Sequence, residues 1–216
     1  LVQVYAHSLP LKDSGQTASR TVGLAMDSGD EAESVITTQM MGQVMYVDFN
    51  QCQDGTEMQQ AVAALAKAVE SGTHQVIIDV RGNGGGNSDT CVQLLNAMGM
   101  APPHYGAYVR YSPLAKGTYP NIYDQDKGGE RYAPQPEAAK ANPKVQLVVL
   151  TDEKTFSSAN MMAVYVRDGK LGTLIGRPSS NMPNHYGDIL AFNLEHTRTY
   201  CTVSHKQWLR PDQSAK

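Results

Sequence analysis

Two adjacent serines, Ser157 and Ser158, lie in the stretch TDEKTFSSANMMAVYVRD (residues 151–168), where a charged loop becomes an apolar run with helical character. Serine is a common helix N-cap, because its hydroxyl accepts from backbone N–H groups that are unpaired in the first turn. A helix N-terminus also stabilises negative charge, which would serve a nucleophile placed there. Capping accounts for one serine and leaves the second unexplained.

A glycine-rich stretch, VIIDVRGNGGGNSD (residues 76–89), follows an apolar run and precedes a helix-like segment. A dinucleotide site needs GxGxxG, but the sixth position counted from Gly82 is Asn87, and a phosphate P-loop needs GK[ST], which is absent here. Two interpretations remain. The glycines form a tight turn that uses their conformational freedom, or they present consecutive backbone N–H groups to one point, as an oxyanion hole requires.

Strand-like and helix-like segments alternate around these two motifs, which indicates an α/β core. We expect a strand over residues 43–49, an amphipathic helix over residues 56–70, a strand over residues 74–80, a helix from Ser88 and a strand over residues 145–151. Residues 1–35 show no sustained period and are predicted to be an N-terminal appendage to a core of residues 36–216. Residues 101–144 form a long connection rich in Tyr, Pro and Gly. Connections of this length inside a compact domain are usually functional or mobile.

Composition excludes several functional classes for the 216-residue chain. The net charge of −3, without a basic cluster, argues against a nucleic-acid partner, and no apolar run is long enough for a membrane span. The three cysteines and six histidines show no metal-binding spacing, so we predict no metal and no cofactor. The cysteines are interpreted as buried small hydrophobic residues.

The two motifs together resemble the S41 serine peptidases, the tail-specific or C-terminal processing proteases and their tricorn-like and chlamydial relatives. The resemblance rests on VIIDVRGNGGGN, followed about 70 residues later by LVVLTDEKTFSSANMMAVYVRDGKLGTLIGRPSS. It implies an α/β fold of the crotonase- and ClpP-like kind, a spiral of ββα units. A PDZ domain often flanks this core in the family, and residues 1–35 could be its remnant.

The resemblance also implies a function and its residues. The nucleophile falls on Ser157, which would form an acyl-enzyme during hydrolysis of a peptide or protein substrate. The backbone N–H of Ser158 and that of Gly85 or Gly86 would form the oxyanion hole. Asp79 and Arg81 would fix the turn rather than act chemically. A bacterial extracytoplasmic location, secreted, periplasmic or at the cell surface, is implied as well.

The proton acceptor departs from the family pattern. Processing proteases use a lysine about 25 residues after the serine, and Met182 stands there in this chain. His185 lies in the same loop and is the candidate base by location, with a pocket wall or solvated loop residue as the alternative. The tricorn-like branch uses a histidine from before the core, where only His7 is found. The rival function is a binding protein on the same fold that holds a peptide or small apolar ligand without turnover.

Overall fold

A five-stranded sheet forms the centre of the computed structural model, which describes residues 34–214. The predicted appendage, residues 1–35, therefore lies almost wholly outside the described residues, and its domain assignment stays a prediction. The strand order is β1-β2-β3-β6-β7, with β1 antiparallel to β2 and the other neighbours parallel. The strands are β1 (Ile36–Met41), β2 (Val44–Phe49), β3 (Gln75–Asp79), β6 (Gln146–Thr151) and β7 (Thr173–Gly176).

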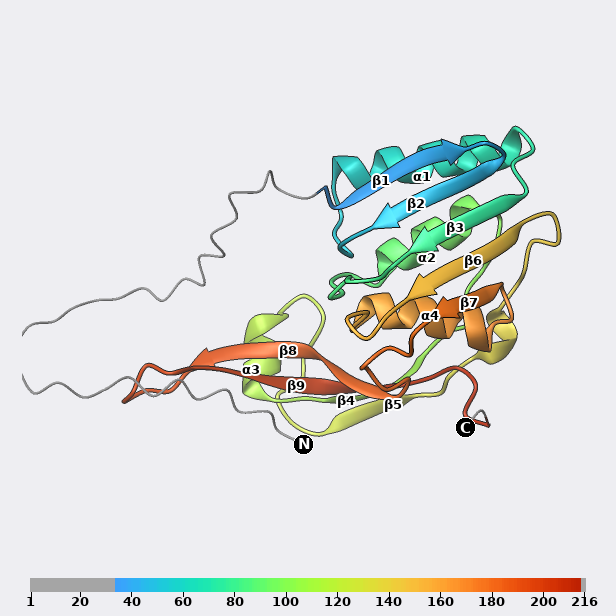
Figure 1. Ribbon diagram of the computed structural model, residues 1–216. Coiled ribbons are helices and arrows are strands. Elements are labelled where there is room, and N and C mark those ends of the chain that lie inside the picture. The colour runs from blue at the N-terminus through green and yellow to red at the C-terminus, as the bar shows by residue number, and fades with distance from the viewer. Residues whose placement is uncertain (1–33, 215–216) are drawn as a thin grey trace, which may run out of the picture.

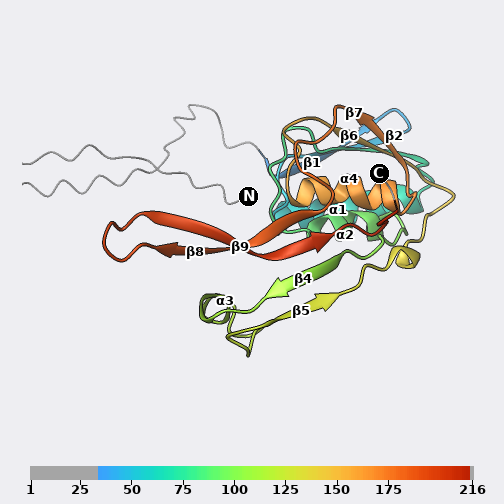
Figure 2. The same ribbon diagram turned by 90° about the horizontal axis from the view of Figure 1, so that it is seen from below.

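Three helices cover one face of this sheet, as Figures 1 and 2 show. They are α1 (Thr56–Glu70), α2 (Asp89–Ala97) and α4 (Ser158–Asp168). Burial alternates along the strands, so that Val76 and Ile78 of β3 are fully buried beneath the helices while Ile77 is half-buried on the other face. The α/β class and the predicted helix over residues 56–70 are confirmed.

A second, antiparallel sheet lies beyond the helices and has the order β5-β4-β9-β8. Its strands are β4 (Gly106–Arg110), β5 (Gly129–Tyr132), β8 (His185–Asn193) and β9 (Tyr200–Leu209). The connection over residues 101–144 supplies β4, β5, the short helix α3 (Pro113–Thr118) and a 3-10 turn, Pro136–Ala138. The hairpin of β8 and β9 extends away from the body as an arm (Figure 1).

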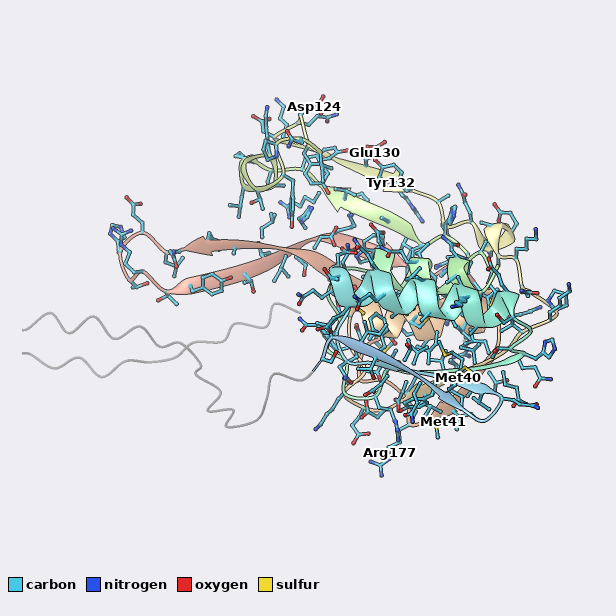
Figure 3. All side chains as sticks on the ribbon, turned by 90° about the horizontal axis from the view of Figure 1, so that it is seen from above. Met40, Met41, Asp124, Glu130, Tyr132 and Arg177 are labelled. Atoms are coloured by element: carbon cyan, nitrogen blue, oxygen red, sulfur yellow. The ribbon has the colours of Figure 1, made fainter. Side chains whose placement is uncertain are left out.

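The base of this arm is fixed to the helical layer by a buried ion pair. Arg210, directly after β9, binds Asp168 at the end of α4, and the two side chains are only 5% and 1% exposed. The backbone N–H of Asp212 also donates to the Asp168 carboxylate, at 3.0 Å. A surface pair differs sharply: Arg177 and Glu153 are 77% and 56% exposed, and Figure 3 shows Arg177 pointing outward.

Candidate active site

Ser157 occupies a strained turn between β6 and α4. Its backbone has φ 50° and ψ −121°, a combination that residues other than glycine rarely adopt and that is concentrated at functional sites. The residue directly precedes the first turn of α4, where N–H groups lack partners within the helix. The turn lies at the carboxyl end of β6, beside the glycine-rich turn that follows β3 (Figure 1).

Neither serine side chain caps α4, although Ser157 holds the N-cap position. The Ser158 hydroxyl donates to the Gly86 carbonyl at 2.7 Å, which joins the two turns. The Ser157 hydroxyl makes no hydrogen bond with any residue of the described chain. The Ser157 backbone N–H donates to Oδ1 of Asn181 at 2.8 Å. The capping interpretation therefore explains neither hydroxyl.

The buried side chain of Asn83 shapes the glycine-rich turn. Its Nδ2 donates to the Phe49 carbonyl at 2.7 Å, and its Oδ1 accepts from the Gly85 N–H at 2.8 Å. The Gly85 N–H is thus already engaged. The Gly86 N–H has no partner among the described hydrogen bonds, and Gly86 is exposed. Of the two glycines, Gly86 is the one with an amide free to bind a ligand.

Both glycines are required sterically. A Cβ on Gly85 would stand 2.6 Å from Cβ of Ser157, and one on Gly86 would stand 2.1 Å from the Cys52 carbonyl oxygen. Their φ values of +99° and +136° lie in the region that disfavours side chains. Gly85 therefore lets the turn lie directly against Ser157, and Gly86 lets it lie against the chain at Cys52.

Asp152 connects the two turns. Its Oδ1 accepts from the backbone N–H of Gly82 at 3.0 Å and from that of Thr155 at 2.9 Å. These backbone hydrogen bonds, that from Gly82 foremost, hold the pKa of Asp152 below its usual value. The Thr155 hydroxyl in turn donates to the Val80 carbonyl at 2.9 Å. The turn after β6 is thereby fastened to the chain just after β3.

Asp79 and Arg81 have a structural role, as expected. The carboxylate of Asp79 accepts from Nε of Arg81 at 2.9 Å and from the Tyr46 hydroxyl at 2.7 Å. Burial alone would raise the pKa of Asp79, but the donors outweigh it and the pKa is lowered. Arg81 folds back onto Asp79 at the end of its own strand.

His185 is not brought into contact with Ser157. It begins β8 and is buried; its Nδ1 lies 3.3 Å from the Pro183 carbonyl, and its ring packs edge-on against Tyr105. Burial lowers the pKa of His185, so the ring is neutral at pH 7. No hydrogen bond or ring contact joins it to Ser157 within residues 34–214. The structure thus gathers Ser157, Ser158, Gly85 and Gly86, and leaves His185 apart.

Two further positions near the serine in sequence make no hydrogen bond to Ser157 within the described chain. Lys154, three residues before Ser157, is exposed, and Met182, at the position of the family lysine, is 72% exposed. No cluster of three or more metal-ligating side chains occurs in the described part of the chain. None of the helices in residues 34–214 combines the length and apolarity needed to cross a membrane.

A family comparison matches these features. The model of Peptidase family S41 matches residues 40–213. The chain belongs to this family. No curated protein sequence matches the chain. The assignment to family S41 points to a peptidase of the serine type.

Solved structures of S41 peptidases share the fold. The photosystem II D1 C-terminal processing protease has 14% sequence identity and a TM-score of 0.54, with 82% of this chain and 44% of that chain covered. Mature CPAF complexed with lactacystin has 15% identity and a TM-score of 0.55, with 81% and 46% covered. The chain thus spans less than half the length of these structures.

Three residues that organise the site were missed by the sequence interpretation. Asn83 stood inside the glycine motif, where its position between glycines could have marked it as the turn's internal acceptor. Asp152 directly follows β6, and an aspartate three residues before a threonine is a common turn signal. Asn181 gives no such signal, because its contact with Ser157 joins segments that are distant in sequence.

Proposed function

We propose that this chain is the catalytic core of a serine peptidase in which Ser157 attacks the carbonyl carbon of a peptide bond. The observation that carries the proposal is the strained backbone of Ser157 at the start of α4, directly against Gly85. A strained turn between a strand and a helix exposes a nucleophilic hydroxyl and places it where negative charge is stabilised. Attack would give an acyl-enzyme that water then hydrolyses.

The oxyanion hole in this proposal consists of the backbone N–H groups of Gly86 and Ser158. Gly86 has a free amide, and Ser158 is the first residue of α4, whose amide has no partner within the helix. The hydrogen bond from Ser158 Oγ to the Gly86 carbonyl fixes these two residues relative to each other. Gly85 contributes space, since its own amide serves Asn83.

His185 remains the proposed proton acceptor, on its place in the chain after α4 and on its neutral state at pH 7. Because its contacts are with Pro183 and Tyr105, the proposal requires residues 177–184 to rearrange when substrate binds. The alternative source of the base is a part of the protein outside residues 34–214.

A binding protein without turnover is the second candidate. Two observations favour it: Met182 occupies the family's lysine position, and the Ser157 hydroxyl has no basic partner in the described chain. Such a protein would hold a peptide or small apolar ligand against the same two turns. Peptide or protein substrates, a flanking PDZ domain and an extracytoplasmic location all belong to the proposal for the full-length protein.

Labelling with a fluorophosphonate separates the two candidates. An activated Ser157 gives stoichiometric labelling mapped to the peptide that contains residue 157, and Ser157→Ala abolishes it. Ser158→Ala is the comparison variant: it keeps the nucleophile and the Ser158 backbone N–H but loses the hydrogen bond that fixes Gly86, so labelling should become slower and still map to residue 157. An unlabelled wild-type chain that still binds peptide would establish the binding protein. Full labelling of Ser157→Ala would refute the assignment of the nucleophile.

His185→Gln tests the base in the same assay. If His185 accepts the proton, labelling of the wild type rises with pH along one limb on the acidic side of the ordinary histidine value, because burial lowers the pKa of His185, and the variant loses both the limb and about 10²–10⁴ in rate. An unchanged limb in the variant would exclude His185. Recovery of strong labelling only in a longer form of the protein would place the base outside the described chain.

A further inference from the structure

Cys52 and Cys91 form a buried pair of thiols that the proposed reaction does not use. Their sulfur atoms lie 3.9 Å apart, and the residues are 2% and 0% exposed. Cys52 lies between β2 and α1, whereas Cys91 lies in the first turn of α2. Burial in an apolar core does not by itself place two cysteine sulfur atoms side by side, as they are here.

The Cys52–Cys91 pair is bonded to both halves of the candidate site. The Cys91 thiol donates to the Ser158 carbonyl at 3.3 Å. The backbone N–H of Cys52 donates to the Gly85 carbonyl at 3.1 Å, and the Cys52 carbonyl accepts from Asn87 at 2.6 Å. The Cys91 sulfur therefore contacts the turn that carries the two serines (residues 156–158, the serine turn). The backbone at Cys52 is paired with the glycine-rich turn (residues 83–87, the glycine turn).

We propose that Cys52 and Cys91 form a reversible disulfide that controls the geometry of the two turns. The oxidant is a hydroperoxide, with hydrogen peroxide as the simplest case. The Cys52 thiol releases its proton, the thiolate attacks one oxygen of hydrogen peroxide, and the O–O bond breaks to give a sulfenic acid and hydroxide, which takes up the released proton and becomes water. Cys91 sulfur then attacks the sulfenic sulfur and releases a second water. Two thiols are oxidised, one peroxide is reduced, and a dithiol reductant reverses the change.

The order of these steps follows from the environment of each sulfur. The single S–H of Cys91 can donate to the Cys52 sulfur in place of the Ser158 carbonyl, and that hydrogen bond lowers the pKa of the Cys52 thiol in spite of burial, so Cys52 has the greater thiolate character. The same hydrogen bond, together with complete burial, raises the pKa of Cys91. Cys52 is consequently the sulfur that reacts first, and Cys91 resolves the sulfenic acid.

Closing the bond changes the site mechanically. A disulfide has an S–S distance of about 2.05 Å, so the sulfur atoms must approach from 3.9 Å. Cys91 loses the proton that it donates to the Ser158 carbonyl. Movement of the Cys52 sulfur also displaces the Cys52 backbone, which is hydrogen-bonded to Gly85. A misplacement of about 1 Å at a reacting centre can cost about 10²-fold in rate. The effect on Ser157 reactivity rests on the proposed function, whereas the disulfide itself does not.

The first experiment detects the bond without reference to activity. Cys201→Ser leaves only the proposed pair, and this variant is treated with hydrogen peroxide. The proposal expects the intact mass to fall by two hydrogens. Trypsin cuts between the two cysteines, at Lys67 and Arg81, so it should release one cross-linked peptide pair that dithiothreitol separates. Cys52→Ala in the same background is the control and cannot lose the two hydrogens. Unmodified thiols, or oxygen added to single cysteines without a cross-link, would overturn the proposal.

The second experiment measures the coupling to the turns. In the cross-linked protein, hydrogen exchange should change in peptides that contain residues 83–87 and 156–158, and fluorophosphonate labelling should fall about 10²-fold and recover on reduction. A cross-link that leaves hydrogen exchange of both turns unchanged would refute the control of the site. Absence of labelling in the reduced protein as well would count against the peptidase, and the mass and exchange results would still decide this inference.

Discussion

At the scale of single residues, the site depends on how closely two turns approach. The turn after β3 lies against Ser157 only because Gly85 lacks a side chain. Asn83 and Asp152 stabilise this arrangement, because each accepts a hydrogen bond from a backbone N–H of that turn. Catalytic chemistry would need two N–H groups and one hydroxyl directed at a single point. In the proposed site, Gly86 and Ser158 supply the N–H groups and Ser157 supplies the hydroxyl, and the hydrogen bonds accepted by Asn83 and Asp152 fix the turns that carry them.

Gly85 and its neighbour Gly84 allow a matched test of this packing. Gly85→Ala places a Cβ against Ser157 at a positive φ, so we expect a loss of at least about 1 kcal/mol in the free energy of unfolding. We also expect a fall of about 10²-fold in labelling of Ser157. A Cβ on Gly84 meets no atom within 4 Å, and Gly84→Ala should stay within about 0.5 kcal/mol of wild type. Urea denaturation and timed labelling measure both quantities; equal results for the two variants would contradict the proposed packing.

The burial of His185 predicts that the stability of the fold depends on pH. Burial holds its pKa in the folded state below the ordinary 6.5. Between pH 6.5 and the lower pKa of the folded state, His185 binds a proton in the unfolded chain but not in the folded chain. The free energy of unfolding therefore falls as the pH drops. His185→Gln should reduce this fall between about pH 7.5 and about pH 5.5, measured by urea denaturation. Asp79 and Asp152, whose pKa values are lowered, contribute only at more acidic pH. An unchanged slope in the variant would contradict the buried, neutral histidine.

At the scale of elements, the arm of β8 and β9 is joined to the body through the buried pair of Arg210 and Asp168. Arg210→Met leaves the Asp168 carboxylate buried without its charge partner, which should destabilise the fold by about 3–5 kcal/mol. Arg177→Met is the control, because its exposed pair with Glu153 contributes less than about 1 kcal/mol. Chemical denaturation of both variants checks the difference, and losses of similar size would show that burial does not govern these pairs.

The sequence predicted the elements that carry a strong local period and missed those defined by distant contacts. The helix over residues 56–70 and the strand after residue 145 follow from periodicity, and the two motifs follow from their residue types. The second sheet was not predicted, because β4 pairs with β9 across about a hundred residues and no local pattern indicates that partner. Asn181 was unpredictable for the same reason, since nothing near it in sequence indicates its hydrogen bond to Ser157.

At the scale of the whole molecule, the arm and the central sheet should differ in local stability. Val76, Ile78 and Val149 in the middle of the sheet are fully buried, whereas residues 191–200 of the arm are almost all exposed. Amide hydrogen exchange should therefore be slowest in β3 and β6 and much faster in the outer half of the arm. Mass spectrometry of the exchanged peptides measures this, and equally slow exchange in residues 191–200 would indicate contacts beyond those of the described chain.

The neighbouring positions of β3 and β6 also determine when the site can form during folding. Residues 80–145, which include the whole of β4 and β5, separate the two strands along the chain. Closing so long a loop carries an entropic cost before any contact compensates it, and parallel pairing between distant segments is slow. During synthesis the glycine turn leaves the ribosome well before the serine turn that packs on it. Ser157 would therefore gain its strained conformation only late, after β6 has emerged and paired with β3.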